Sequence, residues 1–217
     1  MVQILILAAV AAFLFWRLSL VLGIRTGFET KLDINVKNQN LKKKSDNVTS
    51  NSFSDDEDIS DYVELTSKAG QQFKKIKVHE PKFSVKNFVS GAKGAYELIL
   101  MAFEKGNLDL LKNHLAKDVY KDFEAVVIDR ADNGYTVDAS FGGLREIRIR
   151  DVLFDQESMV AEISVFFKCE LTSVVKDKND VIVEGNNSKV KTHTDLWTFG
   201  RVIGTEDPAW KLIATGE

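Results

Sequence analysis

The sequence lacks the residues that build several common kinds of site. It has one cysteine, Cys169, among 217 residues, so neither an intramolecular disulfide nor a multi-cysteine metal site is expected. His79, His114 and His193 lie far apart and form no metal-binding motif. A glycine-rich phosphate loop and a Gly-x-Ser-x-Gly elbow are also missing. We therefore predict no metal, no cofactor and no catalytic residue, and we expect Cys169 to be a small buried residue on a strand.

Proline is scarce and charge is nearly balanced. The two prolines, Pro81 and Pro208, fall where a boundary and a turn are expected. The formal net charge is -3, and the basic residues do not gather in one folded segment, so no nucleic-acid partner is predicted. The hydrophobic fraction of 44% is ordinary for a globular protein. The length allows one domain of usual size with appendages.

A long hydrophobic run occupies the N-terminus. Residues 1–23 are apolar apart from Gln3, Arg17 and Ser19, and as a helix of about 30 Å they would cross a bilayer. Trp16, Arg17 and Arg25 are placed to flank the membrane, with the aromatic ring at the interface. No basic residue precedes the run, so an uncleaved single-pass anchor is favoured over a cleaved signal peptide.

The charges around this run predict its orientation. Lysines and arginines follow the hydrophobic stretch and none precedes it. The positive-inside rule then places the rest of the chain in the cytoplasm, at a bacterial inner (plasma) membrane, with the matrix side of the mitochondrial inner membrane as the alternative. The basic flank either contacts anionic lipid headgroups or is a solvated linker, and these two alternatives stay open.

Two connecting segments follow the expected anchor. Residues 24–61 are rich in Asn, Lys, Ser and Asp, and too few of them are apolar to offset the entropy of ordering the chain. They are predicted to form a disordered tether. Residues 62–80 have weak helical spacing and are predicted to be a linker helix that ends before Pro81. The folded domain is then expected at 81–217.

The first half of that domain has a helical period. Ser84 is a candidate N-cap, and apolar residues recur at intervals of three and four over 85–103. Gly91 and Gly94 lie inside this stretch, where each costs about 1 kcal/mol relative to alanine. Such residues suggest that another backbone or a ligand approaches closely. Two further helical segments follow, up to a turn at 132–134.

Beyond Gly134 the period changes to alternation. Residues 161–171 alternate most clearly, and a bulge is expected near Arg150. The stretch 192–215 is predicted to be a closing hairpin with Trp197, Phe199 and Arg201 on one face. Helices followed by antiparallel strands predict an α+β domain in which two or three helices pack against a curved antiparallel sheet.

This arrangement resembles a known family. The residues that carry the resemblance are Phe83, Phe88, Gly91, Ala92, Ala95, Tyr96, Ala102, Phe103, Gly106, Asn107, Leu110, Leu111, Val119, Phe123, Asp195, Leu196, Trp197, Thr198, Phe199, Arg201, Asp207, Pro208, Trp210 and Leu212. Over about 80–217 they resemble the Tim44-like domain family, in particular the alphaproteobacterial TimA-type homologues of the mitochondrial inner-membrane import translocase subunit. The closing Trp-Thr-Phe, Asp-Pro and Trp elements are the most specific part.

The resemblance implies a fold and a function. The fold is a cone of the cystatin-like, nuclear-transport-factor-two-like kind with a large apolar pocket. Mitochondrial relatives dock on cardiolipin-containing membrane and tether a chaperone motor to a channel. The sequence departs from them in lacking the long chaperone-binding region and in starting with a hydrophobic helix instead of a transit peptide. We therefore expect only a membrane-held binding domain to carry over.

The predicted function is that of an adaptor at the inner membrane, assisting protein translocation or the assembly of membrane complexes. Its partners are an unidentified protein and the membrane. A pocket that accepts a lipid acyl chain or an apolar peptide side chain is the predicted site. Its candidate lining residues are Phe88, Tyr96, Phe103, Trp197, Phe199 and Trp210. The alternative is that these rings are purely structural and pack against one another without a cavity.

A small apolar-ligand-binding protein or an isomerase-like enzyme is the rival from a different class. Cone folds host ketosteroid isomerases, whose sites place an acid or base with a raised pKa in an apolar cavity. The candidates here are His193, Asp195, Tyr96 and Tyr135. Asp195 is instead expected to pair with Arg201 or to cap a turn, and Tyr96 to be a core residue, so no enzyme is predicted. An inward-facing His193 or Asp195 beside a hydrogen-bond donor in a cavity would favour the enzyme.

Overall fold

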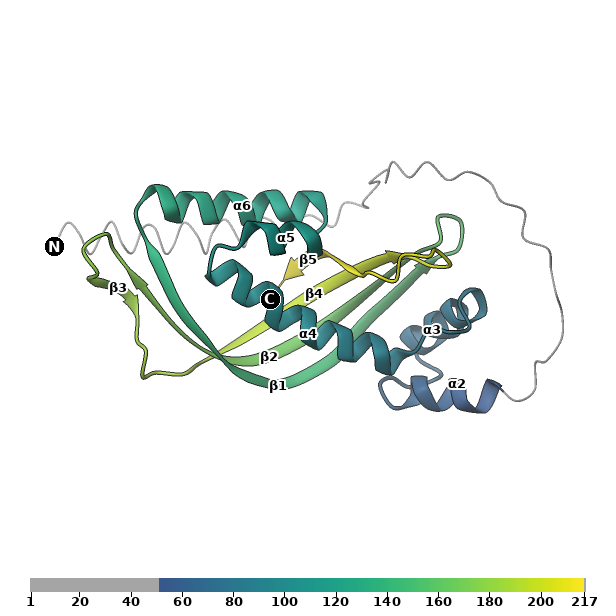
Figure 1. Cartoon of the computed structure of the whole chain (residues 1–217). Coiled ribbons are helices and arrows are strands. Elements are labelled where there is room, and N and C mark those ends of the chain that lie inside the picture. Colours follow the sequence, from purple (N-terminus) through teal and green to yellow (C-terminus); the bar gives the residue numbers. More distant parts are fainter. Residues whose placement is uncertain (1–50, 217) are drawn as a thin grey trace. The chain divides into compact units, whose positions relative to one another are not determined.

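A curved antiparallel sheet carries the fold (Figure 1). The computed structural model describes residues 51–216, so the expected anchor at 1–23, its flanking residues Trp16, Arg17 and Arg25, and the tether up to residue 50 lie outside the described residues. The strand order is β1-β2-β4-β5, with β3 pairing with β2, and every pair is antiparallel. The strands are β1 (Thr136–Asp155), β2 (Val160–Lys176), β3 (Ile182–Gly185), β4 (Lys191–Val202) and β5 (Lys211–Gly216).

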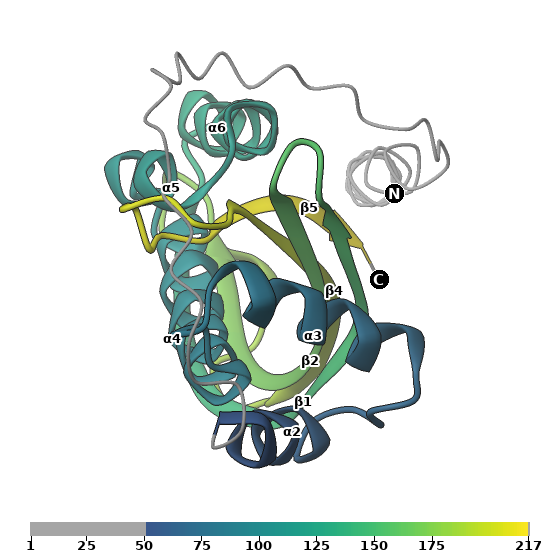
Figure 2. The ribbon, with the colours of Figure 1, turned by 90° about the vertical axis from the view of Figure 1, so that its right-hand side faces the viewer.

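Helices lie around the concave side of this sheet (Figure 2). Helix α4 runs along it, with α3 and α2 near one end and α5 and α6 near the other. The predicted α+β class is confirmed, with more helices in the described part than the expected two or three. The helices are α2 (Asn51–Ser60), α3 (Lys68–His79), α4 (Val85–Glu104), α5 (Leu108–His114) and α6 (Lys117–Asp132). Within residues 51–216, no helix is both long and apolar enough to cross a membrane.

The start of α4 shows how α2 is held. The predicted cap is present, since the Ser84 hydroxyl accepts a hydrogen bond from the third amide beyond it. Asp58 of α2 accepts from the amides of Val85 at 2.8 Å and Lys86 at 3.1 Å. A carboxylate is stabilised at a helix N-terminus because the free amides and the helix dipole both favour negative charge. The buried Lys77 ammonium lies 2.8 Å from the same carboxylate, so α2, α3 and α4 meet at one ion pair.

The expected tether is therefore too long at its C-terminal end. Residues 51–60 form α2, and Ile59 is fully buried in the core. The acidic run around Asp58 has the composition of a solvated linker, but one of its carboxylates caps a helix 27 positions ahead. Composition records polarity and says nothing about such a distant partner.

Helix α3 also belongs to the folded domain rather than to a linker. Phe73 and Ile76 are fully buried, and α3 packs against β1. The helix begins at Lys68, later than the expected residue 62, because the Ser67 hydroxyl accepts from the Gly70 amide and caps it there. Tyr62 remains exposed.

Strand β1 bends strongly around the helices. Its register against β2 shifts three times, at Gly142, Arg145 and Arg150, and the last shift confirms the bulge expected near Arg150. Each bulge adds twist and bends the strand. Gly143, beside the first bulge, has φ of 118°, a conformation that other residues rarely adopt. Bulges and charged side chains also protect an edge strand such as β1 from unwanted pairing.

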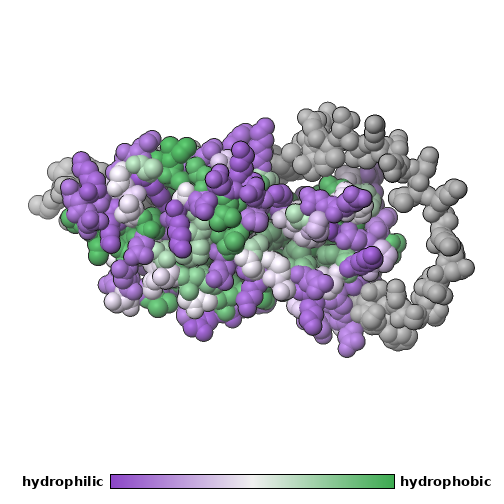
Figure 3. Space-filling view, in the orientation of Figure 1, coloured by the Kyte–Doolittle hydropathy of each residue, from purple (hydrophilic) through white to green (hydrophobic). Residues whose placement is uncertain are grey.

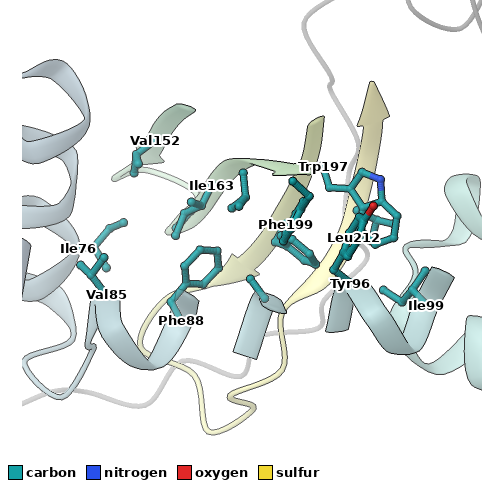
Figure 4. Close-up of a cluster of buried hydrophobic side chains, with 14 of the residues drawn as sticks. Ile76, Val85, Phe88, Tyr96, Ile99, Val152, Ile163, Trp197, Phe199 and Leu212 are labelled. Atoms are coloured by element: carbon teal, nitrogen blue, oxygen red, sulfur yellow. The ribbon is translucent and has the colours of Figure 1, made fainter. Parts of the chain in front are cut away.

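Alternate residues of β2 form the centre of the core. Ala161, Ile163, Val165, Phe167, Cys169 and Leu171 are all buried, as the alternation predicted. They face the apolar stripe of α4, which includes Phe88, Tyr96 and Ile99 (Figure 4). Cys169 is fully buried and burial raises the pKa of its thiol, which confirms the expected apolar role of this residue on a strand.

Candidate binding groove

A groove of about 390 Å³ opens between α4, the end of β4 and the loop before β5. Its volume is near the lower end of the range for ligand pockets, which is about 300–1,000 Å³. We call it the α4 groove. Its apolar walls are Phe83, Phe88, Gly91, Ala92, Ala95, Phe199, Pro208 and Trp210. Its polar lining is Glu80, Lys82, Ser84, Asn87 and Arg201.

Three aromatic side chains shape the groove. The Phe88 ring, from α4, meets Phe199 of β4 edge-on at 6.2 Å between centroids, and both project into the layer between helix and sheet (Figure 4). Trp210 lies 4.8 Å from Phe88, also edge-on. Such pairs contribute about 0.5–1.5 kcal/mol each beyond the area they bury. The wall of the groove is therefore a packed arrangement rather than a set of loose rings.

Glycine opens the groove on the side of α4. No heavy atom outside the immediate backbone lies within 4 Å of a Cβ placed on Gly91 or on Gly94. The sequence suggested that another backbone or a ligand approaches closely at these positions, and the backbone alternative is therefore wrong, whereas the ligand alternative stays a prediction. The missing side chains instead leave free space over the exposed face of the helix, and Gly91 lines the α4 groove.

Arg201 forms the charged part of the lining. Its side chain is only 8% exposed, and its Nη2 donates to both carboxylate oxygens of Glu80 at 2.6 Å. The guanidinium also lies 5.2 Å from the centroid of the Trp210 ring. Burial opposes ionisation of Glu80, but Arg201 and the Gly204 amide outweigh it and hold the Glu80 pKa below its usual value. Helix α3 is thereby tied to strand β4.

The expected pair between Asp195 and Arg201 is not formed. Both residues face the helices, but they lie six positions apart on β4, which is about 20 Å along a strand. The sequence predicted a partner for Arg201 on the same strand, namely Asp195. The observed partner, Glu80, lies 121 positions away in the chain, where the sequence indicated only the end of a helix.

One atom of Arg201 has no partner. The Nε of this side chain is buried, and within residues 51–216 it donates no hydrogen bond. Because Nη2 is already engaged by Glu80, the guanidinium combines a neutralised charge with an unused donor. The groove therefore combines apolar walls with a buried ion pair, and the Arg201 Nε has practically no accessible surface.

Tyr96 lies in a separate polar cluster within the core. Its hydroxyl donates to Asp195 Oδ2 at 2.6 Å and lies 3.2 Å from Cys169 Sγ. Burial, and then the Asp195 charge, raise the pKa of Tyr96, so its hydroxyl is a permanent donor at neutral pH. Its ring stacks on Phe167 at 4.2 Å, which confirms the expected core position.

The fold brings together only two of the four residues that were considered as catalytic candidates, Tyr96 and Asp195. Asp195 faces inward beside the Tyr96 donor, as the enzyme alternative requires, and His193 is exposed opposite Cys169. The lining of the α4 groove contains none of these residues. Tyr135 precedes β1, nine positions from the residue that pairs with Cys169. The four candidates thus share no described cavity.

The six aromatic residues that were predicted to line one pocket lie in three different places. Phe88, Phe199 and Trp210 line the α4 groove. Tyr96 and Trp197 are buried against each other at 4.6 Å, as the structural alternative supposed. Phe103 packs on Phe123 of α6 at 4.8 Å. Residues 88 and 103 are 15 positions apart, roughly 22 Å along a helix, so they cannot line one small pocket.

A second groove lies further along the same helix. It has about 530 Å³ and contains Gly94, Glu97, Leu98, Met101, Ala102, Lys105, Asn107 and Leu110. Leu98 and Leu110 are exposed, at 37% and 36%. Figure 3 shows hydrophobic residues at the surface in the region of α5 and α6. The sequence pointed to Gly94 as a place where a ligand could approach, but it did not indicate the leucines of this groove, because Leu98 and Leu110 fall outside the apolar stripe that faces the sheet.

Comparisons with known proteins identify one family. A sequence model of the Tim44-like domain matches residues 69–217, so the matched region begins in α3 and not at the expected residue 81. The mitochondrial import inner membrane translocase subunit TIM44-1 of Arabidopsis thaliana is 23% identical over 148 residues, which are 64% of this chain and 30% of that protein. The intermembrane space region of the chloroplast protein ARC6 superposes with a TM-score of 0.42 at 13% identity, covering 59% of this chain and 94% of that one.

Proposed function

The chain belongs to the Tim44-like domain family, and we propose that it is a membrane-associated adaptor that assists protein translocation or the assembly of membrane complexes. In this proposal the α4 groove binds a partner and the chain holds that partner at the membrane. The single observation that carries the proposal is the apolar groove with Arg201 in its lining. The name of the plant relative, a translocase subunit of the mitochondrial inner membrane, supports a role in transport.

The adaptor proposal includes a place in the cell. Residues 1–23 would anchor the chain in a bacterial inner membrane, with Trp16, Arg17 and Arg25 at the interface and the folded domain in the cytoplasm. The alphaproteobacterial homologues are the expected relatives, and contact of the basic flank with anionic lipid is part of the proposal. The matrix side of the mitochondrial inner membrane is the alternative, which the plant relative favours.

Binding without catalysis fits the chemistry of the described residues. In the groove, Arg201 engages both carboxylate oxygens of Glu80, so this carboxylate is not available as a general base. The Cys169 thiol has a raised pKa and is fully buried, which makes it a poor nucleophile. Among residues 51–216, the hydrogen bond between Tyr96 and Asp195 is the feature that favours an isomerase-like enzyme or a small apolar-ligand-binding protein of the cone fold. It lies outside the lining of the groove.

The test is recovery of a partner from native membrane by the full-length protein in mild detergent. Gly91→Leu adds an apolar side chain to the lining of the α4 groove, and its Cβ would meet no heavy atom within 4 Å. Gly94→Leu adds the same side chain three positions later, in the second groove, and is the matched control. Both changes raise helix propensity, so loss of folding is not expected from either.

The outcomes separate the possibilities. A defined membrane or chaperone protein that is recovered by the unmodified protein and by Gly94→Leu, but not by Gly91→Leu, supports the adaptor and locates its site. The reverse pattern moves the site to the second groove. A partner that both variants retain refutes a role for either groove.

A further inference from the structure

The second groove has the features of a surface that pairs with a copy of itself. We propose that two copies of this chain associate through it, with their α4 helices antiparallel and a twofold axis beside Met101. Glu97 of each copy then faces Lys105 of the other. This inference goes beyond the proposed function, because it concerns the second groove and not the α4 groove that is proposed to bind the adaptor's partner.

Helix α4 is apolar on two sides. Its buried stripe, which includes Tyr96 and Ile99, faces the sheet. Gly94, Leu98 and Met101 line the second groove, and their spacing of four and three positions places them together on the other side of the helix. Leu98 is 37% exposed. Figure 2 shows α4 at the edge of the folded domain, with the sheet on one side of it. The outer strip is therefore left partly exposed by the described elements.

Opposite charges lie at equal distances from the centre of this strip. Glu97 lies four positions before Met101, and Lys105, the C-cap of α4, lies four positions after it. Both side chains are exposed and line the second groove. Neither has an ion-pair partner among residues 51–216. Eight positions correspond to about 12 Å along a helix, so the two charges are too far apart to pair within one copy.

This symmetry specifies the occupant. In two antiparallel helices related by a twofold axis at Met101, a residue that precedes it by a given number of positions faces the residue that follows it by the same number in the other copy. Each Glu97 therefore meets a Lys105, and the contact forms twice. A foreign partner needs no such symmetry of charge about an apolar centre, whereas a second copy requires it.

Free space beside Gly94 gives the second copy room. A Cβ placed on Gly94 meets no heavy atom within 4 Å. Gly94 lies seven positions before Met101, and seven positions after Met101 is the start of α5. Leu110 of α5 is 36% exposed and lines the same groove. The twofold arrangement thus brings the apolar side of α5 in one copy to the open space beside Gly94 in the other.

The contact is expected to be weak when the protein is free in solution. Stable interfaces bury about 1,200–2,000 Å², which is more than the outer side of one helix supplies, and exposed ion pairs add little. Two copies held in one membrane have a higher effective concentration than two free proteins. The association is therefore to be measured with the full-length protein in lipid vesicles.

The experiment is disulfide crosslinking of Met101→Cys in phosphatidylcholine vesicles, with copper phenanthroline as the oxidant. Packed helices lie about 8–10 Å apart, which brings facing Cα atoms at the axis within the range of a disulfide. The native Cys169 is fully buried, so the unmodified protein gives the background. Lys75→Cys, exposed on α3 and outside the groove lining, is the matched control. We expect Met101→Cys to crosslink about tenfold faster than this control, and equal rates would overturn the inference.

Charge reversal in the Met101→Cys protein tests the pairing itself. Glu97→Lys and Lys105→Glu each create two contacts between like charges, so each should slow crosslinking about fivefold or more. A mixture of these two variants, one with a larger tag, should recover the rate and yield the mixed dimer, because each contact then joins a lysine and a glutamate. Carrying both reversals in one chain should recover the rate as well.

The outcomes decide between pairing and other causes. Recovery in the mixture also shows that both variants are folded, and unchanged helical circular dichroism checks this independently. If both single variants crosslink as fast as their parent, or if the mixture of folded variants stays slow, Glu97 does not face Lys105 and the inference is wrong. Lys75→Glu should leave the rate unchanged, and a slowed rate in it would attribute the effect to net charge and overturn the pairing.

Discussion

Replacing Gly91 by alanine is expected to stabilise the protein. The residue lies within α4, is exposed, and has open space where the new Cβ would be placed. The change therefore adds no clash and leaves only the difference in helix propensity, about 0.8–1.0 kcal/mol in favour of alanine. For a domain of roughly 150 residues, this corresponds to a rise in Tm of about 2–4 °C.

Gly106→Ala is the control variant for this prediction. Gly106 follows the end of α4 with φ of 68°, where a non-glycine residue costs about 1–2 kcal/mol. Its added Cβ would also lie 3.3 Å from a methyl group of Val127. The same chemical change is thus expected to stabilise at one position and to destabilise at the other.

The assay is urea unfolding of the full-length protein in mild detergent, followed by circular dichroism and fitted to a linear dependence of the unfolding free energy on urea. A Gly91→Ala protein with a lower midpoint than the parent would refute the open space described beside α4. Equal midpoints for both variants would refute the contrast in backbone conformation. If Gly91→Ala is more stable but binds its partner less well, the glycine is retained for the groove at a cost in stability.

Three further outcomes are expected. Phe167→Ala should lower the unfolding free energy by about 3–5 kcal/mol, since a fully buried ring is removed from the core; a loss below about 1 kcal/mol in urea unfolding would contradict its central position. The pKa values of Asp58 and Glu80 are lowered in the folded protein, so the stability that these carboxylates contribute is present above their usual pKa values of 3.8 and 4.5 and is lost as the pH falls through the folded values. Glu80→Gln should therefore make the unfolding free energy fall less steeply with decreasing pH at acidic pH. An unchanged dependence on pH would count against the ion pair between Glu80 and Arg201. Cys169 should react with a thiol reagent only as fast as the protein unfolds, and rapid labelling of the folded protein would show that the site is open.

Much of the local structure could be predicted because it depends on neighbours in the chain. The alternation of residues 161–171 predicted which side chains of β2 are buried, and Ser84 predicted where α4 begins. The apolar residues Ile147, Ile149, Val152 and Phe154 predicted a bulge near Arg150, because their alternation changes phase there. Each of these signals is a spacing of a few residues, which covalent geometry converts directly into a face or a helix end.

The candidate site could be predicted only in part. Phe88, Phe199 and Trp210 were expected in a pocket and line the groove. Tyr96 and Trp197 have the same residue types and periodicity, but pack against each other in the core. Periodicity tells which face of an element is apolar and does not tell where along that face the packing leaves a gap.

The sequence by itself determined the α+β class, the apolar faces of α4 and β2, and the family to which the chain belongs. Only the tertiary structure decided that Asp58 caps α4, that Glu80 and not Asp195 engages Arg201, and that Gly91 borders free space. The physical reason is the distance along the chain over which each effect acts. Period and propensity act over one or two turns, whereas an ion pair or a gap depends on which distant elements the whole core brings together.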